Sequence, residues 1–152
     1  MGQIPTPSVP VSWGELLDKM TILEIKQVRI TAPAPRRNVC REYELLRLIG
    51  TEALEAPAVR IIYRCLKRVN EALWQIEDTI REKEAAQQFD PAFIRLARSV
   101  YQMNDRRASL KRDINCLLGS ELVEEKSYAS ISPAELAHHR PPVDLSMARR
   151  SP

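Results

Sequence analysis

The sequence is poor in glycine, histidine and aromatic residues, and each shortage excludes a class of site. Only four glycines occur in 152 residues, too few for either common type of glycine-rich phosphate-binding loop. The two histidines, His138 and His139, are adjacent and lack the spacing of a metal-binding pair. Aromatic residues make up 5% of the chain, which leaves few side chains to stack on bases. We therefore predict no metal site, no cofactor and no catalytic residues, and nucleic acid is disfavoured as a partner.

Long apolar runs and paired cysteines are also missing. No apolar stretch approaches the roughly 20 residues that span a bilayer, and the N-terminus has no basic segment followed by an apolar core. The cysteines are odd in number and far apart, at Cys40, Cys65 and Cys116, which favours reduced thiols over disulfides. We expect a cytoplasmic protein that does not enter the membrane.

What remains is the composition of an ordinary folded domain, 44% hydrophobic and 28% charged. Pro5, Pro7 and Pro10 predict an extended leader over residues 1–11, because proline interrupts both helices and central strands. Residues 12–128 are expected to form a single helical domain. Over residues 129–152, prolines, serines and arginines replace the periodic pattern, which predicts a mobile tail.

In two stretches of the sequence, residues that are apolar at every position but one recur at alternating steps of three and four. The exception is a cation. The first consists of Val59, Ile62, Leu66, Val69, Leu73, Ile76 and Ile80, and the second of Phe93, Leu96, Val100, Met103, Arg107, Leu110, Ile114 and Leu117. This spacing is typical of two helices packed along a shared seam. Between them, Asp90 and Pro91 have the character of an N-cap and a first helical residue. We predict an antiparallel helix hairpin over residues 58–86 and 91–118.

Two shorter helices precede this hairpin. Ser12 and Glu15 form a Ser-x-x-Glu capping box at the start of a helix over residues 13–30. Pro33 and Pro35 are expected to end that helix, and a short bracing helix follows over residues 37–49 with Gly50 as its cap. The sequence therefore predicts an all-α antiparallel bundle without a β-sheet.

Polar residues interrupt the seam at one place. Asn104, Arg107, Lys111 and Asn115 are spaced three, four and four apart, so they form one stripe on a helix. The flank of the N-terminal helix expected to face this stripe carries Asp18 and Thr21. The candidate ligand-binding residues are Asp18, Lys19, Thr21, Asn104, Arg107, Lys111 and Asn115. Either Asp18 pairs with Arg107 or Lys111 to fix the helix register, or the groove holds an anion.

The formal net charge is only +3, but the hairpin gathers cations at its open end. These cations are Arg60, Arg64, Lys67, Arg68, Arg106, Arg107, Lys111 and Arg112. They are balanced either by acids within the chain, above all Glu121, Glu124 and Glu125 just after the last helix, or by an anionic partner.

Two segments carry a family resemblance: Asp-Lys-Met-Thr-Ile-Leu-Glu-Ile-Lys over residues 18–26 and Gly-Ser-Glu-Leu-Val-Glu-Glu-Lys-Ser-Tyr over residues 119–128. Over about residues 10–128 the chain resembles an uncharacterised bacterial family, catalogued as a domain of unknown function. The resemblance brings no activity with it. It does imply that the regions around residues 18–26 and 104–128 form the part that matters.

These observations lead to two hypotheses about function. The first is a non-enzymatic helical interaction or anion-binding module, with a polar groove around Asp18 and Arg107. Its partner is a protein, a second copy of the chain or a small anion, since apolar residues remain on the helix flanks at Ile61, Trp74 and Ile94. The alternative is a small helical enzyme that acts on an anionic metabolite.

Overall fold

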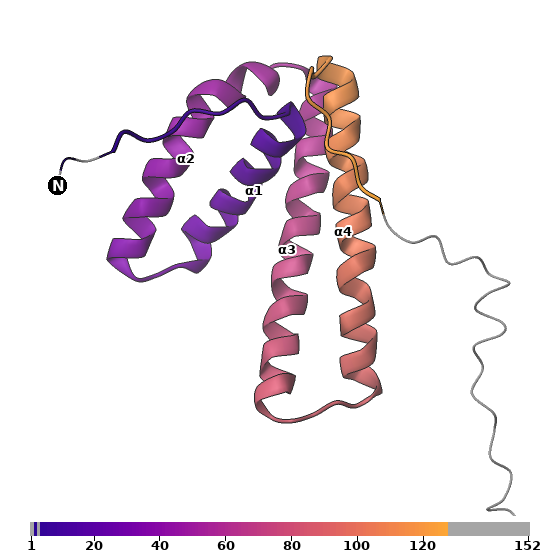
Figure 1. Ribbon diagram of the computed structural model, residues 1–152. Coiled ribbons are helices and arrows are strands. Elements are labelled where there is room, and N and C mark those ends of the chain that lie inside the picture. The colour runs from indigo at the N-terminus through magenta and orange to yellow at the C-terminus, as the bar shows by residue number, and fades with distance from the viewer. Residues whose placement is uncertain (1, 3, 128–152) are drawn as a thin grey trace, which may run out of the picture.

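The computed structural model describes residues 2 and 4–127, and in this part of the chain it contains four helices and no strand (Figure 1). The helices are α1 (Trp13–Arg29), α2 (Pro33–Ala53), α3 (Pro57–Ala85) and α4 (Pro91–Leu118). The predicted all-α fold and the predicted long hairpin are confirmed. The predicted tail, residues 129–152, lies outside the described residues. None of the four helices is both long and apolar enough to cross a bilayer.

Two helix hairpins, α1–α2 and α3–α4, meet at one end and splay apart at the other (Figure 1). Helix α1 packs against each of the other three helices, whereas α2 packs mainly against α1. Helix α1 is therefore the central element, and it brings residues near the start of the chain against α4.

Three predicted helix ends are confirmed. The Ser12 hydroxyl accepts a hydrogen bond from the Glu15 amide at 3.2 Å, and the Asp90 carboxylate accepts one from the Phe93 amide at 2.8 Å. Each side chain satisfies an amide that has no partner within its helix. Gly119 ends α4 in the left-handed region, with φ of 60°.

The predicted bounds of the second helix, residues 37–49, are wrong, because α2 is longer at both ends. It begins at Pro33 itself. The first-turn amides of a helix have no internal acceptor, so Pro33 and Pro35 both fit there. Gly50 is not a cap but a buried residue within the helix. A Cβ atom at Gly50 would overlap the side chain of Met20, so the missing side chain lets α1 and α2 approach closely.

The core lies where the two hairpins meet. Its buried residues come from all four helices: Leu16, Leu17, Met20, Ala53, Val59, Tyr63, Leu66 and Ile114. The predicted seam position Leu117 is 52% exposed, and Leu118 packs against the core in its place. The reason is that 3.6 residues per turn drift away from a strict heptad spacing. Between residues 74 and 110, all of them described, no side chain is fully buried, so the far part of the α3–α4 hairpin is a thin two-helix arm.

Candidate functional site

The centre of the polar site is an ion pair between α1 and α4. Arg107 donates from Nε to Oδ1 of Asp18 at 3.0 Å and from Nη2 to Oδ2 at 2.5 Å. Asp18 is 2% exposed. Its hydrogen bonds to Arg107 outweigh the effect of burial and raise the pKa of that guanidinium above its usual value. The pairing expected from the register hypothesis is therefore present.

Two further polar side chains complete the buried network around Asp18. The amide Nδ2 of Asn70, on α3, donates to Oδ1 of Asp18 and to Oγ1 of Thr21, both at 2.8 Å. The Thr21 hydroxyl in turn donates to the Asp18 carbonyl oxygen at 2.8 Å. The network thus joins α1, α3 and α4. Asn70 was not among the predicted site residues, although its place beside the seam residues Leu66, Val69 and Leu73 marks it as facing inward.

A second ionic cluster forms around Lys111, one turn further along α4. Its ammonium group donates to Glu15 of α1 and, at 2.6 Å, to Oε2 of Glu124. Lys126 lies 3.3 Å from the other oxygen of Glu124. Burial lowers the pKa of Lys111, but its hydrogen bonds to Glu124 and Glu15 outweigh this and raise the pKa overall. The hydrogen bond from Lys111 lowers the pKa of Glu124 to about 2.

Glu124 thus balances part of the basic end from within the chain, one of the two alternatives that the sequence leaves open. Its two acidic neighbours differ from it. Glu121 and Glu125 are exposed and pair with no side chain in the part of the chain that the structure describes. Only one of the three predicted acids therefore enters the site.

Asn115 and Lys19, two other predicted site residues, serve helix packing. Oδ1 of Asn115 accepts the Gly14 amide at 2.7 Å, where the backbones of α1 and α4 are so close that a Cβ atom at Gly14 would lie 2.5 Å from the Lys111 carbonyl oxygen. Lys19 points to α2 and pairs with Glu42 at 2.6 Å on the surface. Of the seven predicted residues, Lys19 is the one that lies away from the polar stripe.

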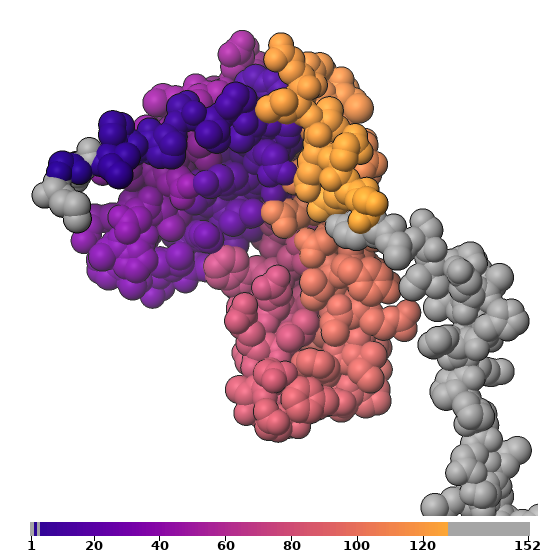
Figure 2. Space-filling view, in the orientation of Figure 1, coloured from indigo at the N-terminus to yellow at the C-terminus, as the bar shows by residue number. Residues whose placement is uncertain are grey.

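Two pockets flank Arg107. We call the first the polar pocket; it has a volume of about 280 Å³ and is lined by Glu15, Asn104, Arg107, Ala108, Lys111, Glu124 and Lys126. Together with Asp18, its ionised groups number three acids and three cations, so their charges cancel. Residues 121–127 are exposed and lie over α4. They are the lightest orange part of the chain in Figure 2.

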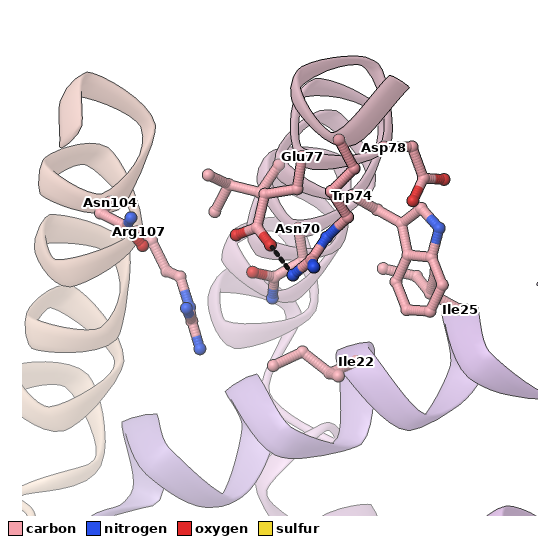
Figure 3. Close-up of a pocket in the computed structure, with 10 residues that line it drawn as sticks. Ile22, Ile25, Asn70, Trp74, Glu77, Asp78, Asn104 and Arg107 are labelled. Carbon is pink, nitrogen blue, oxygen red and sulfur yellow. Dashed lines mark ion pairs between the residues drawn. The ribbon is translucent and has the colours of Figure 1, made fainter. Parts of the chain in front are cut away.

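The second pocket, of about 350 Å³, lies between the two hairpins (Figure 3). Arg107 and Asn104 of α4 face Asn70 and Glu77 of α3 across it, and Trp74 lies near Ile25 of α1. Glu77 pairs with Arg81 at 3.9 Å. With Asp18 counted as before, this pocket has three acids and two cations among apolar walls, so it offers less to an anion than the polar pocket does.

Glu24 of α1 forms a third polar centre. It accepts hydrogen bonds from the hydroxyls of Tyr63 at 2.5 Å and Tyr43 at 3.1 Å, and it pairs with Lys67 at 2.8 Å. Burial and the neighbouring Glu24 carboxylate raise the pKa of Tyr43 to about 12 and raise that of Tyr63 as well. The remaining predicted cations, Arg60, Arg64, Arg68, Arg106 and Arg112, are exposed.

Comparisons with known proteins identify a family but bring no activity. Neither the curated proteins nor the solved structures contain a match to this chain. A model of a family of unknown function, DUF6165, matches residues 8–138. The matched range includes every residue of the polar network and of the Lys111 cluster. The chain therefore belongs to this family of unknown function.

Proposed function

We propose that this chain is a non-enzymatic helical module that binds an anionic group in the polar pocket. The observation that supports this is the position of Glu124. Residues 121–127 are exposed, yet the Glu124 carboxylate from this segment is held between Lys111 and Lys126. The pocket thus already has the donors that a carboxylate or phosphate needs, and Glu124 occupies them in place of a ligand.

The charge of the pocket favours exchange of Glu124 for an external anion. With Glu124 in place the acids and cations cancel, and without it the pocket carries one excess positive charge. Arg107 uses Nε and Nη2 for Asp18, while its Nη1 and the Asn104 amide have no partner among the described residues. These groups are additional donors for an incoming anion.

The test compares two variants with the same change in charge. Glu124→Gln removes the internal competitor, whereas Glu125→Gln removes an exposed acid next to it. Binding of inorganic phosphate and of succinate is measured by isothermal titration calorimetry. The affinity should be about tenfold higher for Glu124→Gln than for the natural chain, the equivalent of one charge-assisted hydrogen bond. Glu125→Gln should bind like the natural chain.

Adding Lys111→Met to Glu124→Gln should abolish the binding, since Lys111 is the donor that both anions need. The proposal is wrong if Glu124→Gln binds neither phosphate nor succinate, or if both glutamine variants gain equally through net charge alone. The alternative, an enzyme acting on an anionic metabolite in the cytoplasm, would use the same pocket. No observation on the described residues favours it over binding.

A further inference from the structure

The outer face of α2 carries apolar side chains that remain more than half exposed. Leu45, Leu48 and Ile49 are 58%, 73% and 56% exposed. Helix α2 packs mainly against α1, and it forms the side of the molecule furthest from the α3–α4 hairpin (Figure 1). Helical spacing places Leu45, Leu48, Ile49 and Glu52 at i, i+3, i+4 and i+7, the four positions that form the hole for a side chain of a facing helix.

An apolar groove continues this face. It has a volume of about 830 Å³ and lies between the N-terminal segment and α2, where Val9, Val11, Leu45 and Ile49 contribute to its walls. Val9 and Val11 are themselves 70% and 53% exposed. A partner seated on α2 would therefore cover more apolar surface than the helix alone presents.

Four charges along the same face are separated by sign, while Glu44 and Arg47 between them pair with each other. Arg37 and Arg41 precede the leucines by one to three turns; Glu52 follows them within α2, and Glu55 comes two residues after the end of the helix. All four side chains are exposed, and none forms an ion pair within the part of the chain that the structure describes. Two copies of α2 placed side by side in opposite directions would therefore set arginines opposite glutamates.

We propose that two copies of this chain associate through this face, with their α2 helices antiparallel. A two-fold axis between residues 46 and 47 sets Leu45 of one copy against Leu48 of the other and Arg41 against Glu52. Arg37 then lies near the second copy's Glu55. A parallel arrangement would instead place like charges together, so the charge pattern selects both a second copy and its direction. The inference does not depend on the proposed anion site.

The test begins with the mass of the natural chain in sedimentation equilibrium, from about 1 μM to about 1 mM, the range in which a small interface dissociates. The mass should rise from that of a monomer to that of a dimer. Leu48→Glu should remain monomeric throughout, with an unchanged circular dichroism spectrum because the residue is exposed. Ile61→Glu is the matched control, since Ile61 is another exposed apolar residue, on α3, at 61% against 73% for Leu48, and it should dimerise like the natural chain.

Charge exchange tests the antiparallel direction. Arg41→Glu and Glu52→Arg should each weaken dimerisation at least tenfold, because each places like charges opposite one another twice. An equimolar mixture of these two variants should recover dimers, since every facing pair is again of opposite sign. A natural chain that stays monomeric at every concentration overturns the proposal, as does a dimer lost in Ile61→Glu but kept in Leu48→Glu. A mixture that does not recover dimers overturns the antiparallel arrangement.

Discussion

Arg107 of α4 and Asp18 of α1 are joined by three hydrogen bonds at a seam position where an apolar residue would otherwise pack. They are separated by 89 positions in the sequence. We expect the pair to fix the register of α1 against α4, because shifting either helix by one residue would turn a buried charge away from its partner. The same arginine also borders the polar pocket, so the register pair and the proposed binding site share one residue.

The register role predicts a strong dependence of stability on each partner. Arg107→Leu or Asp18→Leu alone should lower the free energy of unfolding by about 3–5 kcal/mol, because each leaves an uncompensated charge in a buried setting. The double variant should recover most of this loss. Urea unfolding of the three variants measures the coupling. Equal stability of Arg107→Leu and the natural chain would contradict a register role.

The lowered pKa of Glu124 predicts that segment 119–127 detaches in acid. A carboxylate with a depressed folded-state pKa contributes stability above its unfolded value, 4.5, and that contribution is lost as the pH falls towards about 2. Because Glu124 is partly exposed, the loss should be local and not global. Amide chemical shifts of residues 120–127 should move to random-coil values over this interval in the natural chain. In Glu124→Gln they should already be at random-coil values at pH 5, and identical shifts in both proteins would rule out this role for Glu124.

The close approach of α1 and α4 at Gly14 predicts a steric effect. Gly14→Ala should lower the free energy of unfolding by about 1–3 kcal/mol, the usual cost of overpacking, because the new Cβ atom meets backbone that cannot turn aside. Gly2→Ala is the control, since a Cβ atom there has no neighbour within 4 Å. Thermal unfolding compares the two. If Gly14→Ala and Gly2→Ala have the same melting temperature, α1 and α4 are not in close contact at Gly14.

The Glu24 centre predicts a loss of stability in alkali. Phenols with raised folded-state pKa values contribute stability that is complete below their unfolded value, 10.0, and is lost as the pH rises, through about 12 for Tyr43. The double variant Tyr43→Phe, Tyr63→Phe lacks these phenols, so its stability should decline less steeply above pH 10. Urea midpoints at pH 8 and pH 11 give both slopes. An equal decline in the urea midpoint of both proteins between pH 8 and pH 11 would contradict a role for the two phenols.

Periodicity and capping residues were enough to predict the α3–α4 hairpin, because a long regular repeat of apolar residues allows one helical phase. The start of α2 could not be predicted in the same way. Proline is found both just after the end of a helix and in the first turn of the next one. Pro33 and Pro35 therefore indicate a break between two helices but not whether they belong to the second helix. Gly50 presents a similar ambiguity, since close packing and capping both favour glycine.

At the site, the sequence predicted the residues that disturb an apolar pattern. Arg107 and Asp18 each stand on a largely buried face, where a charge demands a partner, and the structure pairs them. Lys19 was included through its place beside Asp18, but one residue along a helix turns a side chain by about 100°, and Lys19 faces α2. The contact of Glu15 with Lys111 depends on how α1 crosses α4, which no local pattern encodes.

The far part of the α3–α4 hairpin should open more often than the rest of the domain. It has no fully buried side chain between residues 74 and 110. Local openings require little free energy where few apolar contacts are broken. Backbone amides near the turn at residues 86–90 should therefore exchange with solvent through frequent fraying of the two helix ends. Those of α1, which is enclosed by three helices, should exchange only when the whole domain unfolds. One polypeptide thus combines a slowly exchanging centre with a rapidly opening arm.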